Sequence, residues 1–249
     1  MASAIKRLAV IPARTGSKEL PGKNVRPFAG VPLIAHTILF AKGCPQVTRC
    51  IVSTDSSSIA DVARQFGAEV PFLRPEALAQ DDTPLWPVLR HALAMAEAED
   101  GQPYDELLLL DPTSPARTIE DVTGALRRLH EAPSADGVVS VSRPEFNPVW
   151  HCVVEQDGWM ADLIPGGGRI TRRQDAPVVY RINGALYIWR TRFLRAAQPS
   201  WRTGRHVIYE IPESRAISID TLEAFERAEL LVKSGMIAFP WMQGQHASR

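Results

Sequence analysis

A loop near the start of the chain combines positive charges with glycine and hydrogen-bonding side chains. It directly follows a short apolar run at residues 8–13, which is typical of a buried strand. Cations and backbone donors stabilise the charge that develops when a nucleotidyl group leaves a triphosphate. The loop therefore predicts a site for a phosphorylated ligand, with a solvated basic turn as the alternative; no Gly-Lys-Ser/Thr ends it, so it is not a P-loop. Its side chains are Arg14, Ser17, Lys18, Lys23 and Asn24, and Gly16 allows close backbone approach.

Two aspartates follow short segments rich in apolar residues in other parts of the chain. Asp111 comes directly after residues 107–110, and Asp220 comes after residues 217–219. Mg²⁺ is usually held by one or two carboxylates together with substrate phosphates. If both runs are strands that end at one sheet edge, the two aspartates can supply such a site. The alternatives are a turn cap at Asp111 and a helix N-cap at Asp220.

A third polar group lies in the second half of the chain, around Arg172, Arg173 and Gln174, followed by Arg181 and Asn183. The guanidinium fork matches a carboxylate, so arginines with amides suit a carboxylate-bearing sugar. A solvated charge run is the alternative.

The remaining polar candidates are less specific. Asp81 and Asp82 could form a metal pair, but a loop with helix capping explains them equally well. The histidines do not cluster, and we expect structural roles for His36 and His91 within helices. Ser114 lacks the Gly-x-Ser-x-Gly context of a hydrolase nucleophile.

The composition excludes several classes of partner. The 249 residues carry 28 Lys and Arg against 28 Asp and Glu, so no global field attracts nucleic acid or an anionic membrane. The three cysteines form no Cys-x-x-Cys, which indicates reduced thiols. The first apolar run is too short for a signal sequence, and no run has membrane length. We expect a cytoplasmic protein, without nucleic-acid or membrane partners, that forms one domain over residues 1–249.

Apolar runs alternate with amphipathic segments throughout the first half. This alternation predicts an α/β fold with a parallel doubly wound sheet, whose ligands bind at the carboxyl edge. Threonines at 83 and 118 are expected N-caps. The second half changes character: residues 143–180 predict antiparallel strands and loops in a small appendage. The predicted strands are 8–13, 49–54, 68–72, 107–110, 137–141, 181–187 and 217–220, and the predicted helices are 32–41, 56–66, 84–97, 119–131 and 222–233.

The opening loop, IPARTGSKELPGKN at residues 11–24, resembles the signature IPARGGSKGLPxKN of the acylneuraminate cytidylyltransferases. The resemblance implies a Rossmann-like, three-layer nucleotidyltransferase fold and a homodimer in which residues 143–180 reach the partner. It also implies transfer of CMP from CTP to the anomeric hydroxyl of a nonulosonic (sialic-type) acid, a nine-carbon 2-keto acid sugar, with Mg²⁺ as cofactor. The other matching motifs, in family order, are VSTD (52–55), FLRP (72–75), QDDT (80–83), PTSP (112–115), RQ (173–174), YRINGA (180–185) and IDT (219–221).

The resemblance also implies roles for individual residues. Arg14, Lys18 and Lys23 are the expected catalytic cations, and Arg173 is expected to serve the partner's site. The implied CTP-binding residues are Ala13, Arg14, Ser17, Lys18, Lys23, Asn24, Arg74, Asp82 and Thr83. With Arg181 and Asp111 added from the residue types, the expected sugar-binding residues are Asp111, Arg173, Gln174, Arg181, Asn183 and Tyr187.

The chain departs from the family pattern at four positions. Thr15 replaces a usual glycine, and Glu19 adds a negative charge beside the phosphate site. Ser218 stands where the family usually has the first aspartate of Asp-Ile-Asp, and Asp111 stands where many members have glutamine. Our hypothesis is that Asp111 and Asp220 hold the Mg²⁺, which resembles the aspartate pair of the 3-deoxy-manno-octulosonate (KDO) cytidylyltransferases.

Three alternatives follow from these departures. Asp111 could face the sugar and alter its choice, the acceptor could be KDO, or the chain could be a catalytically weak CTP-binding homologue because Ser218 removes a metal ligand.

Overall fold

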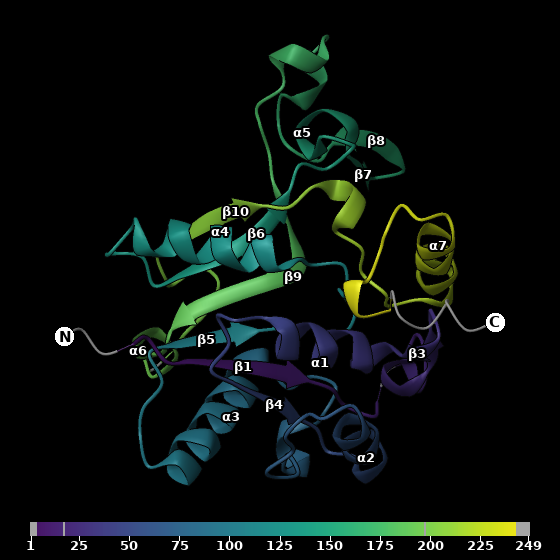
Figure 1. Ribbon diagram of the computed structural model, residues 1–249. Coiled ribbons are helices and arrows are strands. Elements are labelled where there is room, and N and C mark those ends of the chain that lie inside the picture. Colours follow the sequence, from purple (N-terminus) through teal and green to yellow (C-terminus); the bar gives the residue numbers. More distant parts are fainter. Residues whose placement is uncertain (1–3, 17, 197, 243–249) are drawn as a thin grey trace.

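A six-stranded sheet forms the centre of the molecule (Figure 1). The computed structural model describes residues 4–16, 18–196 and 198–242. The strand order is β10-β6-β9-β5-β1-β4, and β9 is antiparallel to both of its neighbours while the other pairings are parallel. The predicted mostly parallel α/β sheet is confirmed. Its strands are β1 (Arg7–Pro12), β4 (Arg49–Ser53), β5 (Glu106–Leu109), β6 (Gly137–Ser142), β9 (Arg181–Arg190) and β10 (His206–Glu210).

The central strands are buried on both faces, which produces three layers. Successive side chains of a strand point to opposite faces, and in β1 Leu8 and Val10 pack on one side while Ala9 and Ile11 pack on the other. One face is covered by α1 (Leu33–Gly43), α2 (Ser57–Gln65) and α4 (Ile119–His130). The opposite face is covered by α3 (Leu85–Asp100) and α6 (Thr191–Leu194).

Helix α4 begins with the cap that the sequence predicts. The Thr118 hydroxyl accepts from the Asp121 N–H at 3.3 Å, and the Asp121 carboxylate accepts from the Thr118 N–H at 2.8 Å, which is a complete capping box. The predicted cap at Thr83 is wrong. Pro84 occupies the N-cap position of α3, and the Thr83 hydroxyl instead donates to the Ala77 carbonyl oxygen at 3.5 Å.

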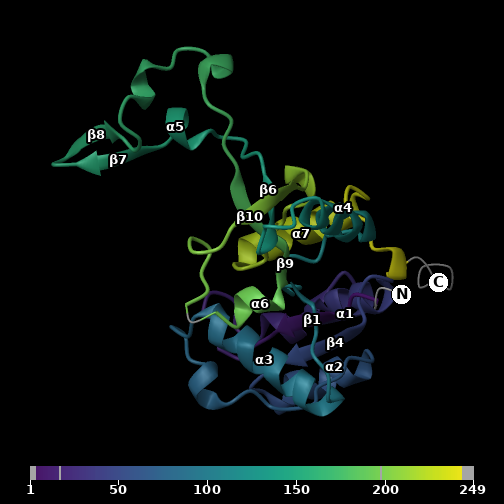
Figure 2. The ribbon, with the colours of Figure 1, turned by 90° about the vertical axis from the view of Figure 1, so that its left-hand side faces the viewer.

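Residues between β6 and β9 form an arm that projects from the body of the molecule (Figure 2). It contains α5 (Pro148–His151) and the antiparallel hairpin β7 (Val153–Gln156) and β8 (Trp159–Asp162). The predicted change to antiparallel strands in this segment is confirmed. The arm's role in dimerisation stays a prediction, as does the treatment of residues 1–249 as one domain.

A third cluster of apolar side chains joins α7 (Leu222–Lys233) to the small hairpin β2 (Pro27–Phe28) and β3 (Val31–Pro32). Residues 217–220 precede α7 and form no strand, so the predicted last strand is wrong. The segment is held beside the loop after β5 by one bond, from the Ile219 N–H to the Thr113 carbonyl oxygen at 2.9 Å. That bond places Asp220 close to the carboxyl end of β5.

Two further differences concern strands at the margins of the sheet. Residues 68–72 form one isolated bridge to β4, between Glu69 and Ile51, instead of the predicted strand, and a second bridge joins Leu73 to Thr54. Strand β10, which the sequence analysis missed, pairs with β6 at the sheet edge. Among the described residues, no helix is long and apolar enough to cross a membrane.

Candidate active site

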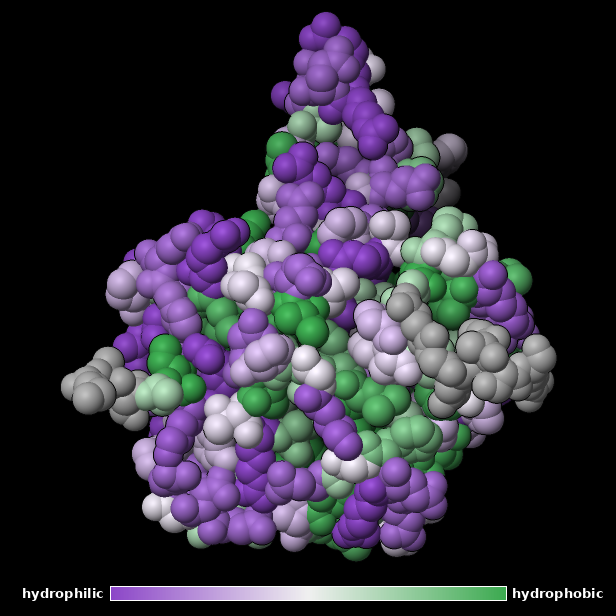
Figure 3. Space-filling model, viewed as in Figure 1, coloured by the Kyte–Doolittle hydropathy of each residue, from purple (hydrophilic) through white to green (hydrophobic). Residues whose placement is uncertain are grey.

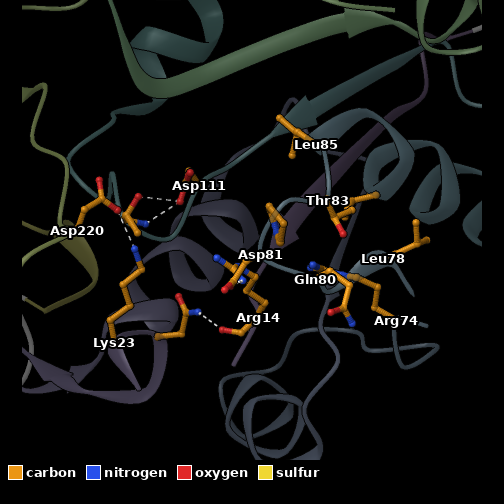
Figure 4. Close-up of a pocket in the computed structure, with 14 residues that line it drawn as sticks. Arg14, Lys23, Arg74, Leu78, Gln80, Asp81, Thr83, Leu85, Asp111 and Asp220 are labelled. Carbon is orange, nitrogen blue, oxygen red and sulfur yellow. Dashed lines mark hydrogen bonds and ion pairs between the residues drawn. The ribbon is translucent and has the colours of Figure 1, made fainter. Parts of the chain in front are cut away.

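A cavity of about 260 Å³ opens at the carboxyl ends of β1 and β5 (Figure 4). Its walls come from the basic loop after β1, the loop that leads into α3, the turn after β5 and the residue before the N-cap of α7. The sheet edge is the one that the sequence predicts for ligand binding. The lining residues are Pro12, Arg14, Lys23, Asn24, Arg74, Leu78, Gln80, Asp81, Thr83, Leu85, Val88, Asp111, Thr113 and Asp220.

Two of the loop cations lie beside one carboxylate. Arg14 forms an ion pair with Oδ1 of Asp81, and Lys18 Nζ lies 2.5 Å from Oδ2 of the same residue. The Asn24 side-chain amide donates to the Arg14 carbonyl oxygen at 3.2 Å and so joins the two ends of the loop. Lys18 itself does not line the cavity, and Ser17 lies outside the described residues.

Thr15, which replaces a glycine of the family signature, attaches the loop to the end of β4. Its hydroxyl donates to Asp55 Oδ2 at 2.7 Å and its N–H donates to Asp55 Oδ1 at 3.2 Å. Glu19 is exposed. The substitution at position 15 therefore adds an anchor for the loop, because a glycine would lack the hydroxyl donor.

Lys23 and Asp220 form the charged pair on the other side of the cavity. Lys23 Nζ lies 2.7 Å from Asp220 Oδ1, and the Ser218 hydroxyl donates to Asp220 Oδ2 at 2.7 Å. Partial burial raises the pKa of Asp220, but the hydrogen bonds from Lys23 and Ser218 outweigh it and the pKa is lowered overall. Asp220 is therefore an anion at neutral pH.

Asp111 lies in the turn after β5 with one oxygen engaged. Its Oδ1 accepts from the N–H and the hydroxyl of Thr113, at 3.0 and 2.8 Å. Among the described residues, no donor bonds to Oδ2. Asp111 thus caps its own turn, as the alternative interpretation expects, and still offers one carboxylate oxygen to the cavity that Asp220 also lines.

Arg74 is a buried cation on the far wall. Its side-chain Nε donates to the Ser53 hydroxyl at 3.1 Å, and its backbone N–H donates to the Thr54 carbonyl oxygen at 2.7 Å. Burial lowers the pKa of Arg74, and the nearby charge of Asp55 partly opposes this effect. Thr83 lines the same wall, whereas Asp82 is exposed. Ala13 is buried, does not line the cavity, and donates its N–H to the Ser53 carbonyl oxygen.

The residues expected on the sugar side are dispersed. Arg173 and Gln174 are exposed on the arm and do not line the cavity. Arg181 pairs with Glu213 at 2.7 Å and lines a separate surface groove. Asn183 is buried, accepts from the Ser140 hydroxyl at 2.6 Å, and donates to the Ser142 hydroxyl at 2.9 Å. Its amide therefore joins β6 to β9 instead of facing the cavity.

Tyr187 lies close to Asp111 within an aromatic cluster. Its ring stacks on Trp189 with centroids 5.5 Å apart, and Trp201 packs at 4.7 Å. Burial raises the pKa of Tyr187 to about 12, and the negative charge of Asp111 contributes to the shift. Tyr187 is therefore a neutral phenol at the edge of the site.

Some cavity residues were missed by the sequence analysis. Asp81 was considered only as a metal or capping group. Asp55, which anchors Thr15 but does not line the cavity, was considered only as part of a motif. Gln80 and Thr113 carry no chemical signal that would separate them from ordinary loop residues. The apolar wall of Leu78, Leu85 and Val88 is indistinguishable in sequence from helix core.

Comparisons with known proteins bear on the family to which the chain belongs. Residues 8–142 match the cytidylyltransferase family. The chain is 41% identical over 187 residues to CMP-N,N'-diacetyllegionaminic acid synthase of Legionella pneumophila, which covers 73% of this chain and 76% of that protein. It is 32% identical over 224 residues to N-acylneuraminate cytidylyltransferase of Streptococcus agalactiae serotype V, which covers 89% of this chain and 52% of that protein.

The fold also matches a solved structure. The structure of CMP:2-keto-3-deoxy-manno-octonic acid synthetase complexed with CTP superposes with a TM-score of 0.68 over 92% of this chain and 99% of that one, at 19% identity. At that identity the match concerns the fold alone, and it confirms the predicted nucleotidyltransferase architecture. With the family match over more than half of the chain, the resemblance seen in the opening loop is confirmed. The chain belongs to the cytidylyltransferase family.

Proposed function

We propose that this enzyme transfers CMP from CTP to the anomeric hydroxyl of a nonulosonic acid and releases pyrophosphate. One observation carries the proposal. The phosphate-loop residues Arg14 and Lys23 share a single cavity with Asp111 and Asp220, in a chain that is 41% identical to a CMP-N,N'-diacetyllegionaminic acid synthase. The cavity thus combines cations for a triphosphate with carboxylates for a metal ion.

The reaction forms one bond and breaks another. The anomeric oxygen bonds to the α-phosphorus of CTP, the bond from that phosphorus to the bridging oxygen of the β-phosphate breaks, and the hydroxyl proton passes to solvent. Arg14, Lys18 and Lys23 stabilise the charge on the leaving pyrophosphate. Arg74 and Thr83 line the cavity away from Lys23 and Asp220, and we assign the nucleoside end of CTP to them.

Mg²⁺ belongs to the same proposal, and the residues present fit it. Asp111 and Asp220 both line the cavity and offer hard carboxylate oxygens. Oδ2 of Asp111 accepts no hydrogen bond from a described residue, and the two oxygens of Asp220 accept from Lys23 and Ser218, which leaves a lone pair on each for a metal ion. Among the described residues, no cluster of three or more histidine, cysteine or acidic side chains could hold a metal alone. Two carboxylates completed by substrate phosphates are the usual arrangement for Mg²⁺. When bound, the ion would neutralise developing charge on the phosphates.

A homodimer completes the proposed sugar site. Arg173 and Gln174 lie on the arm, away from the cavity of their own chain, so they would serve the partner's cavity. The face of the arm seen in Figure 3 is mostly hydrophilic, but Trp159 and Met160 at its hairpin are 78% and 80% exposed. Large exposed apolar side chains of this kind are typical of an interaction surface. Mixing Arg173→Ala with Lys23→Met subunits should restore activity if the arm acts in trans.

The cytoplasm is the proposed compartment. Cys44, Cys50 and Cys152 are all free thiols in the structure. Unpaired cysteines of this kind are expected in a reducing compartment. A fractionation experiment with the native protein tests this part of the proposal.

The decisive experiment measures pyrophosphate release from CTP and Mg²⁺ with a panel of acceptor acids. We expect release with N,N'-diacetyllegionaminic acid or another nonulosonic acid, such as N-acetylneuraminic or pseudaminic acid. Release with KDO alone would assign the chain to the alternative acceptor class. Tight CTP binding without release from any acid would identify a catalytically weak nucleotide-binding homologue and overturn the proposal.

A further inference from the structure

Asp81 occupies an unusual place in the proposed phosphate site. Its carboxylate pairs with Arg14 through one oxygen and with Lys18, at 2.5 Å, through the other. Asp81 also lines the cavity itself (Figure 4). An anionic group from the loop that leads into α3 thus lies against the cations that were assigned to a triphosphate.

The two loops are otherwise anchored at different places. The basic loop is fixed by the bonds of Thr15 to Asp55 and by the bond of Asn24 to the Arg14 carbonyl oxygen. The loop of Asp81 is fixed at its start by the bonds of Arg74 to Ser53 and Thr54. Between residues 76 and 83 the other hydrogen bonds that the structure describes are local, such as Gln80 Nε2 to the Glu76 carbonyl oxygen at 2.9 Å. The contacts of Asp81 therefore hold the second loop onto the first, and the hydrogen bonds from Lys18 and Arg14 lower the pKa of Asp81 so that it stays ionised.

We propose that Asp81 is a stand-in anion, which holds Arg14 and Lys18 in position when no nucleotide is bound and is displaced by the phosphates of CTP. The inference rests on the proposed function, because it takes the basic loop to be the triphosphate site. One cation cannot pair fully with two anions at once, so each anion weakens the binding of the other. Asp81 therefore lowers the affinity for CTP and keeps the empty loop ordered.

The coupling is reciprocal and modest. Bound CTP weakens the contact between the two loops by a certain factor, and that contact weakens CTP binding by the same factor. Removing the carboxylate therefore tightens CTP binding. Arg14, Lys18 and Asp81 are all partly exposed, and exposed ion pairs are weak and screened by salt. We expect a gain in CTP affinity of roughly two- to tenfold at low ionic strength, which decreases at high salt.

Three variants separate this role from general electrostatics. Asp81→Asn removes the stand-in charge, and Asp81→Glu restores a carboxylate on a longer side chain. Glu76→Gln removes one negative charge from the same loop; Glu76 is exposed, does not line the cavity and forms no ion pair among the described residues. The two neutral variants change the net charge equally, so only the contact with the basic loop distinguishes them.

The experiment titrates the full-length protein with CTP and, separately, with pyrophosphate, by calorimetry at low and at high salt. Asp81→Asn should bind both ligands more tightly than Glu76→Gln, and Asp81→Glu should return toward the wild-type dissociation constant. The KM of Asp81→Asn for CTP should fall below that of Glu76→Gln. In thermal unfolding without nucleotide, the Tm of Asp81→Asn should lie below that of the wild-type protein. At saturating CTP the two proteins should have the same Tm.

Equal or weaker CTP binding by Asp81→Asn, compared with Glu76→Gln, would overturn the stand-in role, and weaker binding would place Asp81 among the groups that support the bound nucleotide. This outcome is distinct from failure of the proposed function. If the wild-type protein binds CTP and releases pyrophosphate but Asp81→Asn gains no affinity, only the inference is lost. If the wild-type protein binds no CTP, the proposed function itself is lost.

Discussion

Lys23 Nζ and Asp220 Oδ1 lie 2.7 Å apart although 197 positions separate the two residues in the chain. The lysine side chain is 15% exposed and the aspartate side chain 52%. The second oxygen of Asp220 is held by Ser218. The pair joins the basic loop after β1 to the start of α7 and fixes the direction of a carboxylate at the cavity.

Lys23→Met removes the ammonium and keeps an unbranched apolar stem. We expect kcat for pyrophosphate release to fall by roughly 10²- to 10³-fold, the usual cost of one preorganised charge-stabilising donor. Lys233→Met is the matched control, because Lys233 is an exposed lysine of α7 whose one ion pair with a described residue is to Glu229. A loss of activity in both variants, or in neither, would contradict the assigned role.

Asp111→Asn tests the proposed metal ligand at saturating CTP. The amide keeps the acceptor oxygen for Thr113 and removes the charge, so the turn should survive. We expect the Mg²⁺ concentration for half-maximal activity to rise at least roughly 10- to 100-fold, because the loss of an outer-shell partner of a ligand already costs that much. Asp61→Asn, on the exposed face of α2, is the control.

An unchanged Mg²⁺ dependence would show that Asp111 is not a ligand. If the variant instead changes the order of preference among acceptor acids, Asp111 faces the sugar and contributes to its selection.

Ser218→Ala removes the hydroxyl that donates to Asp220 Oδ2. Since this bond stabilises the carboxylate, its loss must raise the pKa of Asp220. The acid limb of the pH profile of kcat/KM should move to higher pH, by up to about one pH unit for a half-exposed group. Ser218→Thr keeps the hydroxyl and should retain the wild-type profile. An identical acid limb in Ser218→Ala would mean that Asp220 does not control it.

His36 predicts a pH dependence of stability. Its Nε2 lies 2.8 Å from the Phe28 carbonyl oxygen, and its Nδ1 accepts from Trp241 Nε1 at 3.2 Å. This arrangement suits a neutral ring with the proton on Nε2, because a proton on Nδ1 would face the indole N–H. Burial lowers the pKa of His36 to about 4, against the opposing effect of the Phe28 bond.

The sign of the effect follows from proton linkage. The unfolded chain takes up a proton near pH 6.5, where folded His36 stays neutral, so stability is full above that pH and is lost as pH falls toward 4. The lowered pKa corresponds to about 3 kcal/mol of unfolding free energy. In denaturant titrations, His36→Gln should lose less stability between pH 7 and pH 4 than the wild type. His151→Gln, at an exposed site on α5, should behave like the wild type; equal losses in all three proteins would exclude His36 as the source.

Strands that are buried on both faces were predictable from sequence, because their apolar content is continuous. Residues 107–110 and 137–141 are examples, and both correspond to central strands of the sheet. Strand β10 was missed because an edge strand with partly exposed side chains, HVIYE, lacks this signal. Residues 217–220 alternate between apolar and polar as a half-buried strand does but form no strand, because Ile219 is buried against the loop after β5 and in the α7 cluster instead of in a ladder.

The sequence by itself determined the alternation of strands and helices, the cap of α4, and the basic loop with its family signature, because each depends on neighbouring residues in the chain. Tertiary structure decided which groups meet. It paired Lys23 with Asp220, directed the amide of Asn183 into the contact between β6 and β9, and set Asp81 against Arg14 and Lys18. Such pairings depend on the packing of distant segments around one sheet, and the residue types alone allow each polar group several partners.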